Sequence, residues 1–345
     1  MMAHLPGLHL TVFLLLRSCG WLTWASTLEA TKVNRDGSGA MPTDIPRVSL
    51  GVWGESCDSG KPQMSLVQSR VSRRKGLPKA PKPWDVRMYF VAEHHKSGSV
   101  LLAQVLRLIF RDLGSPQCCS TVPHMNVTNN SVPCDEYPNS TIQVHANPSP
   151  DTVQQVRATA RRQNLDLRAV HAIRKPKDML VSAYCFSMRG QEADDPAFAN
   201  FPWVEFLSNG PAAGMLTLWN WEMHRQFSYM VDMYARMTPL ETFTMRYEEV
   251  TKSTADFDEN IQGLLRHFFD GLVSETVLQE LADSAKLEDL HRHPEIGHEH
   301  PNDPDCMETA HAALLSLDPA ILEQLKAWQA QLGYSIENWP EPVID

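Results

Sequence analysis

The fold is decided by residues 86–101, which read VRMYFVAEHHKSGSVL. Val86–Ala92 is a short apolar run that predicts a strand, and the polar turn Glu93–Ser99 follows it. Beyond the turn, apolar residues recur at helical spacing as Val100, Leu101, Val105, Leu106, Leu108, Ile109 and Leu113. A strand, a glycine-bearing turn and a helix form a β–α unit, which exposes main-chain N–H groups where an anion can bind.

Further strands and helices alternate along the rest of the chain. Strands are predicted at 141–145, 167–173 and 241–247. A helix is predicted to open at Ser149-Pro-Asp and another to run through Met188, with further helices at 202–235, 255–269 and 274–283 and a closing helix or helix pair at 311–333. Ser149 is the expected N-cap of the helix that begins at Pro150. This alternation predicts an α/β fold of three layers, a mostly parallel sheet with helices on both faces.

The N-terminus has the composition of a targeting segment. Leu8–Leu16 is apolar but too short to span a membrane comfortably, and Arg17 interrupts it. We therefore expect residues 1–28 to be a signal peptide or a short signal-anchor. Residues 29–83 are rich in Gly, Ser, Pro and basic side chains and are expected to form a stem or linker. Residues 84–345 remain as the globular domain.

Two further features favour the secretory pathway. Glycosylation sequons begin at Asn126, Asn129 and Asn139. Outside the targeting segment there are six cysteines, Cys57, Cys118, Cys119, Cys134, Cys185 and Cys306, an even number that suits disulfides in an oxidising compartment. A bridge from Cys134 to either Cys118 or Cys119 would close the loop that carries the sequons.

The first candidate for chemistry is the turn Lys96-Ser97-Gly98-Ser99. It lies between a strand and a helix, where Gly98 permits close approach and Lys96 adds a full positive charge. The nucleotide-triphosphate loop G-x-x-x-x-G-K-[ST] is absent, because here the lysine precedes the glycine. The alternative is a tight turn with an exposed lysine and no ligand.

The second candidate is the stretch Arg174-Lys-Pro-Lys-Asp178, with Ser182 four residues further on. Arg174 follows a predicted strand, and ligands collect at the carboxyl ends of strands in open α/β sheets. Ser182 lies one helical turn beyond Asp178, so the Arg174 guanidinium and the Ser182 hydroxyl could share one phosphate. The alternative is a basic surface turn.

Taken together, these motifs resemble those of the sulfotransferases that use 3′-phosphoadenosine 5′-phosphosulfate (PAPS). The family's K-[ST]-G-[ST] loop matches Lys96–Ser99, and its R-x-P-x-D-x-x-x-S motif matches Arg174–Ser182 in full. The similarity spans roughly 86–285 and includes Phe206–Pro211, Trp219 and Arg246-Tyr-Glu-Glu-Val. It implies that the 5′-phosphosulfate binds Lys96, Ser97, Gly98, Ser99, Val100 and Leu101, and that the 3′-phosphate binds Arg174 and Ser182.

The chain departs from the family in two places. Cytosolic members carry an aromatic residue that stacks on adenine where this chain has Leu101, and they carry a C-terminal R-K-G segment that this chain lacks. The resemblance therefore leaves adenine recognition unassigned.

The acceptor's proton needs a base. His145 ends the second long strand, where cytosolic members have a catalytic histidine, and an imidazole with a pKa near 6.5 suits that role. Lumenal members often use a glutamate, and Glu93 is the alternative here. His94 and His95 are interpreted as a solvated turn, with contact of one of them to the sulfuryl group as the alternative. The tract His291, His293, His298, His300, Asp303 and Cys306 resembles a metal site but has no tight zinc spacing, so we expect an irregular charged loop and no metal.

Composition narrows the class of partner. Hydrophobic residues make up 43% and charged residues 21%, as in globular proteins, and the net charge of −10 argues against a nucleic-acid binder. The resemblance implies sulfuryl transfer from PAPS, and the expected secretory route implies a glycan, glycolipid or other lumenal acceptor in the Golgi or outside the cell, with membrane attachment through the N-terminus as an option. The alternatives are a catalytically inactive carbohydrate-binding protein on the same fold and a nucleotide kinase-like enzyme.

Overall fold

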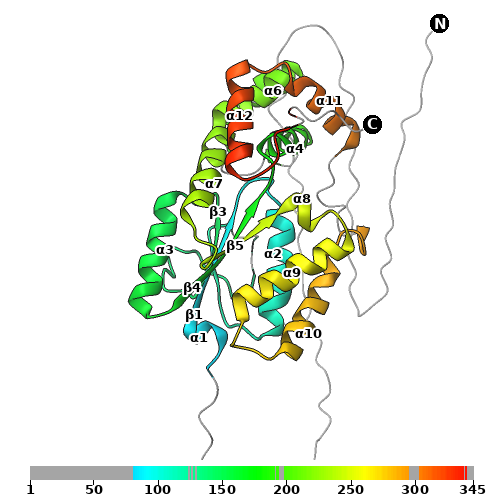
Figure 1. The fold of residues 1–345 in the computed structure, drawn as a ribbon. Coiled ribbons are helices and arrows are strands. Elements are labelled where there is room, and N and C mark those ends of the chain that lie inside the picture. The colour runs from blue at the N-terminus through cyan, green and yellow to red at the C-terminus, as the bar shows by residue number, and fades with distance from the viewer. Residues whose placement is uncertain are drawn as a thin grey trace, which may run out of the picture. The chain divides into compact units, whose positions relative to one another are not determined.

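The computed structural model describes residues 81–122, 125, 127–128, 130–190, 192–193, 198–294, 303–337 and 339 (Figure 1). The targeting segment, nearly all of the stem, the sequons at Asn126 and Asn129, Cys57 and the centre of the His-rich tract lie outside these residues. None of the helices among the described residues is long and apolar enough to cross a membrane.

Five parallel strands form the sheet. They are β1 (Arg87–Glu93), β2 (Cys119–Ser120), β3 (Ile142–Ala146), β4 (Asp166–Ile173) and β5 (Thr242–Arg246). Their order is β2-β3-β1-β4-β5, and every neighbouring pair is parallel. The central strand β1 contains Arg87–Ala92 of the predicted strand and extends to Glu93, whereas Val86 ends the helix α1 (Pro83–Val86); the buried residues of β1 alternate between the two faces. Parallel strands need covered faces, which explains the apolar run Met88–Ala92 in the central strand.

Helices cover both faces of the sheet, so the predicted three-layer α/β fold is confirmed (Figure 1). The helices are α1 (Pro83–Val86), α2 (Ser99–Asp112), α3 (Pro150–Gln163), α4 (Pro176–Met188), α5 (Trp203–Ser208), α6 (Gly210–Leu218), α7 (His224–Arg236), α8 (Tyr247–Val250), α9 (Thr254–Phe269), α10 (Glu275–Ala285), α11 (Pro304–Leu314) and α12 (Pro319–Gln331). A π-helical turn, Trp219–Met223, joins α6 to α7. The predicted cap is also confirmed: the Ser149 side chain accepts from the N–H of Thr152.

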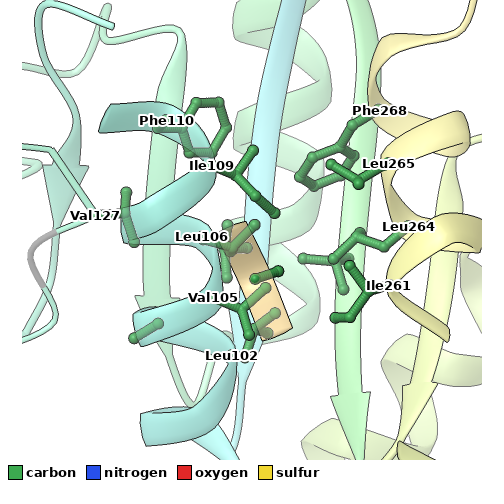
Figure 2. Packing of buried hydrophobic residues seen from close by; sticks show 14 of the residues in the cluster. Leu102, Val105, Leu106, Ile109, Phe110, Val127, Ile261, Leu264, Leu265 and Phe268 are labelled. Atoms are coloured by element: carbon green, nitrogen blue, oxygen red, sulfur yellow. The ribbon is translucent and has the colours of Figure 1, made fainter. Parts of the chain in front are cut away.

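One face of β1 packs on α2, α9 and α10. Tyr89 and Val91 belong to this core, and Figure 2 shows Leu106 and Ile109 of α2 pointing toward Leu264 of α9. The opposite face carries Met88, Phe90 and Ala92, which pack against α3 and α7. The period of two along the strand therefore places alternate residues in two separate cores, which fixes the register of β1.

The carboxyl ends of the strands meet a third group of helices. α4, α6, α11 and α12 gather there and share one apolar core (Figure 1). A disulfide between Cys185 and Cys306 joins α4 to α11. Sequence patterns placed Cys306 in an irregular loop, and that placement is wrong, because Asp303 caps a helix that begins at Pro304.

The second disulfide joins Cys119 to Cys134, one of the two bridges left open by the sequence. Cys118 is a free, buried thiol, the only one among the described cysteines. Asn139 follows the bridged loop and is exposed, as a glycosylation acceptor must be.

Candidate active site

The turn between β1 and α2 is held in a conformation that few residues tolerate. Lys96 has a φ of 64° and Gly98 a φ of 95°, both in the left-handed region. Gly98 occupies the N-cap of α2, so no side chain caps the helix. A Cβ at Gly98 would lie 2.7 Å from Cδ2 of Tyr247, so only glycine fits there. The start of a 14-residue helix is thus left open to an anion.

Internal hydrogen bonds fix the turn. The N–H of His94 donates to the Ser97 hydroxyl at 3.0 Å, and that hydroxyl donates to the carbonyl of His94 at 2.8 Å. The N–H of Ser97 donates to the same carbonyl at 2.9 Å. Ser97 is fully buried, so both of its donors serve the turn itself. Asn147 accepts from the N–H of His95 at 3.0 Å, which ties the turn to the end of β3.

Arg174 extends from the end of β4 to this turn. Its Nη1 donates to the main-chain oxygen of Lys96 at 3.1 Å. The guanidinium carbon lies 4.3 Å from the ring centroid of Tyr247, the same ring that packs on Gly98. Arg174 is only 8% exposed, and its Nε has no partner within the described part of the chain. A buried charged group with an unused donor is suited to bind an anion.

Glu248 of α8, which follows β5, fixes the main chain next to Arg174. Glu248 accepts from the N–H of Lys175 at 2.8 Å and from the hydroxyl of Tyr334 at 2.8 Å. The main chain just after Arg174 is thereby fixed by a residue of α8 and by the chain after α12.

Ser182 lies buried on α4. Asp178, Ser182 and Cys185 are spaced four and three residues apart, so they share one face of the helix. That face meets α11, because Cys185 is bonded to Cys306 and Asp178 lies 3.9 Å from Nε2 of His311. The structure therefore brings Lys96, Gly98, Arg174 and Tyr247 together and places Ser182 on the adjoining helix.

Imidazoles crowd the carboxyl end of the sheet. His145 and His171 both pair with Ala92, one from each neighbouring strand, so the three lie in a row on the α3 face. The Nε2 atoms of His94 and His171 are 3.0 Å apart, so one of them must be the donor and the other the acceptor. The ring of His145 lies 5.5 Å from that of Phe90, and its Nε2 is buried without a partner in the described chain.

Burial sets the charge of these groups. It lowers the pKa of His145 to about 4 and that of His171 to about 3. It also lowers the pKa of His94 well below the usual range, and the neighbouring His171 adds to this effect. All three imidazoles are therefore neutral at pH 7. The lowered pKa of His145 differs from the ordinary value assumed from the sequence, because the strand end is covered rather than open to water.

Burial shifts the pKa of Glu93 upward, opposite to its effect on the histidines. It is 1% exposed, and neither carboxyl oxygen has a partner within the residues described. Burial raises its pKa to about 8. The side chain is thus protonated at neutral pH and cannot accept a proton there.

Glu192 approaches the turn from the segment after α4. Its Oε1 lies 3.0 Å from Nε2 of His95, and Ser187 donates to its Oε2. Lys96 is close by, with its Nζ 2.8 Å from the ring centroid of Phe186. Burial lowers the pKa of Lys96 to about 7, Glu192 acts against this, and Arg189 and Arg174 add to it. His95 is therefore paired with a buried carboxylate, not simply part of a solvated turn.

Sequence reasoning missed His171 and Glu192. His171 could have been noticed as the one ionisable residue inside the apolar run Ala169–Ile173. Glu192 has no such signal, because it follows α4 in a polar stretch and is brought to His95 only by the fold.

No group of three His, Cys, Asp or Glu side chains among the described residues could hold a metal ion. Within the His-rich tract, His291 lies with its Nε2 2.9 Å from the carbonyl of Thr251. Asp303 is used as an N-cap and Cys306 in a disulfide, so neither is available as a ligand.

Comparisons with known proteins do not identify a family for this chain. No protein-family model matches the chain, and no curated protein matches it. Among solved structures, it is similar to the mouse sulfotransferase SULT7A1 complexed with PAP, with a TM-score of 0.40 and 13% identity over 74% of this chain and 92% of that one. A TM-score this low carries no functional weight, so the function must be inferred from the residues of the site.

Proposed function

We propose that this protein is a PAPS-dependent sulfotransferase, which moves a sulfuryl group to an acceptor hydroxyl or amine and releases PAP. The observation that carries the proposal is the 3.1 Å hydrogen bond from Arg174 to the main chain of Lys96. It joins the two motifs that would bind the two phosphate ends of the nucleotide. Both lie at the carboxyl ends of adjacent parallel strands, where open α/β sheets bind ligands.

The phosphosulfate would lie on the turn before α2. The main chain of Gly98, Ser99, Val100 and Leu101 presents the start of the helix to it, and Lys96 supplies the charge. Ser97 would act through the turn it stabilises, since its hydroxyl is already used.

The 3′-phosphate would be bound by Arg174 and Ser182. The unused Nε of Arg174 offers a donor, and Tyr247 holds the guanidinium in place by stacking. Ser182 would contribute its hydroxyl from α4. With Leu101 in place of an aromatic, we assign no side chain to the adenine ring.

Sulfuryl transfer is an in-line displacement, so most of the rate comes from positioning and charge stabilisation. As the S–O bond to the leaving phosphate breaks, negative charge grows on PAP. Lys96 in its protonated form stabilises that charge. At a pKa of about 7 the free lysine is partly protonated at neutral pH, and the anionic nucleotide favours the charged form.

We propose His145 as the base that takes the acceptor's proton. It is neutral at pH 7 and has an unpartnered ring nitrogen, so it can accept. Glu93 already holds its proton at that pH. This difference favours His145 over Glu93.

The proposed location is the lumen of the Golgi or the exterior of the cell, with the N-terminal segment as signal peptide or signal-anchor. Two disulfides and the exposed sequon at Asn139 support an oxidising, glycosylating compartment. The acceptor is then a glycan, a glycolipid or another lumenal molecule.

Two other functions make different use of the site. An inactive carbohydrate-binding protein would not need the buried Arg174 with its unused donor, nor the Lys96 turn. A nucleotide kinase would need the lysine after the glycine and a strand-end aspartate for magnesium; the lysine precedes Gly98 here. Both are less consistent with the site than sulfuryl transfer.

The test is a transfer assay with sulfur-labelled PAPS against a panel of glycans, glycolipids and small lumenal alcohols and amines. Label moving to any acceptor in the wild type, and not in Lys96→Ala, supports the proposal. Tight PAP binding without transfer to any acceptor would instead favour the inactive binding protein. Phosphoryl transfer from ATP would favour the kinase.

A further inference from the structure

A series of polar contacts connects the end of α4 to the turn before α2. Ser187 donates to one oxygen of Glu192, and the other oxygen lies 3.0 Å from Nε2 of His95. Glu192 is 5% exposed. A buried carboxylate is costly unless it is paired, so its position beside the site needs an explanation beyond packing.

Lys96 contacts the same turn of α4. Its Nζ lies over the ring of Phe186, and Glu192 accepts a hydrogen bond from Ser187, the residue after Phe186. His95 is also the neighbour of Lys96 in sequence. The Lys96 ammonium and the Glu192 carboxylate therefore share neighbours on two elements.

The other charges around Lys96 have its own sign. Arg174 comes from the end of β4 and Arg189 from the end of α4, and both disfavour a protonated lysine, as does burial. His95 adjoins it on the turn. Glu192 is the one acidic group acting on Lys96 among the described residues. Burial raises the pKa of Glu192, but His95, Ser187 and Lys96 outweigh this and keep it below its usual value, so the carboxylate is charged.

We propose that Glu192 is a positioning residue: it orients His95 and acts as the counter-charge that increases the protonated fraction of Lys96 before the nucleotide binds. The catalytic part of this inference rests on the proposed sulfuryl transfer. The electrostatic part does not, because it concerns only the state of Lys96 in the free protein.

The direct test measures the titration of Lys96 without any ligand. The full-length protein is labelled with acetic anhydride at pH 5.5 to 9, and the acetylation of each lysine is measured by peptide mass spectrometry. Only the unprotonated amine reacts. In Glu192→Gln the midpoint for Lys96 should fall by about one pH unit relative to the wild type. The exposed Lys252, distant in sequence, serves as the internal reference and should not change.

Matched variants separate charge from packing. Gln at position 192 keeps the shape and a hydrogen-bonding group but removes the charge. Glu192→Asp restores the charge and should return the midpoint most of the way. His95→Gln removes the imidazole but keeps the carboxylate, so Lys96 should stay close to wild type. Circular dichroism confirms that each variant is folded; if Glu192→Gln does not fold, the Glu192→Asp and His95→Gln midpoints decide.

Turnover provides the second readout. At pH 7, kcat/KM of Glu192→Gln should fall about fivefold, which is the loss of protonated Lys96 in the free protein that a one-unit shift from a pKa of about 7 produces, while PAP affinity measured at pH 6 stays within about threefold of wild type. An unchanged Lys96 midpoint in folded Glu192→Gln, or a midpoint shift equally large in His95→Gln, would overturn the inference. If the midpoint shifts as expected but wild-type protein neither binds PAP nor transfers sulfate, the proposed function fails while the role of Glu192 stands.

Discussion

Tyr247 packs so closely on Gly98 that a Cβ at that glycine would lie 2.7 Å from Cδ2 of its ring. The same ring stacks on the Arg174 guanidinium, 4.3 Å away. One aromatic side chain from the end of β5 therefore fixes both the turn after β1 and the arginine after β4. The shape of the proposed nucleotide site depends on three strands meeting at one edge of the sheet.

Because of this contact, a substitution at Gly98 directly tests the conformation of the turn before α2. Gly98→Ala should be destabilised by more than about 1 kcal/mol, from the strained φ and from the clash with Tyr247, and PAP affinity should fall more than tenfold. Gly114 is the matched control, because its φ of 69° is also positive but nothing lies within 4 Å of a Cβ there. Gly114→Ala should show only the strain, with PAP affinity unchanged. Denaturant melts and calorimetry measure both; equal PAP affinity in the two variants would contradict the assignment of the turn.

PAP binding should depend on the shape of the Arg174 guanidinium as well as on its charge. Arg174→Ala should weaken PAP binding by about 2–5 kcal/mol, because it removes one partner of a desolvated charge pair. Arg174→Lys keeps the charge but loses the planar group that stacks on Tyr247 and the fork that reaches both Lys96 and a phosphate. It should therefore recover only part of the loss in calorimetry. Full recovery by lysine would show that the geometry described here is not what binds PAP.

The proposed base can be tested against its rival by kinetics. His145→Ala and His145→Asn should lose two to four orders of magnitude in turnover, roughly what general-base catalysis contributes, with PAP affinity close to wild type. Glu93→Gln should stay active. Because burial lowers the pKa of His145 to about 4, kcat/KM should not rise through an imidazole titration between pH 6 and 8. A fully active His145→Ala enzyme would end the assignment.

The raised pKa of Glu93 should make the free energy of unfolding depend on pH. The usual pKa of the group is 4.5 and in the folded protein it is about 8, so between these pH values the unfolded chain loses a proton that the folded protein keeps. Wild type therefore loses stability as pH rises from 5 to 8, by up to about 1.4 kcal/mol per pH unit. Glu93→Gln does not titrate, so its stability relative to wild type should increase over this range and level off above pH 8. Urea melts at pH 5, 6.5 and 8 measure this; a constant difference would contradict the burial of Glu93.

Local patterns were sufficient to predict much of the fold. The strands β1, β3, β4 and β5 and the cap at Ser149 follow from apolar runs, turn residues and capping, which act within a few residues. The start of α11 was missed, because its cap at Asp303 lies in a His-rich tract without an apolar period.

The candidate site was predictable only where its residues belong to a local motif. Lys96, Gly98 and Arg174 carry local motifs, so the sequence could identify them. The contacts of Glu192 with His95, of His171 with His94 and of Tyr334 with Glu248 come from the packing of the segment after α4, of β4 and of the chain after α12, which no local pattern encodes. The pKa of His145 also depends on burial, which could not be known before the sheet was assembled.

The central claim, that Arg174 and the Lys96 turn together form a site for a nucleotide with a 3′-phosphate, is tested most directly by comparing ligands that differ in that phosphate. Calorimetry of the purified protein should be done with PAP, adenosine 5′-phosphate and ATP at one salt concentration. The account predicts that PAP binds at least a hundredfold more tightly than the other two, a difference of about 2.7 kcal/mol, because only PAP can use the buried donor of Arg174. Equal affinity for the three nucleotides, or tighter binding of ATP, would contradict it.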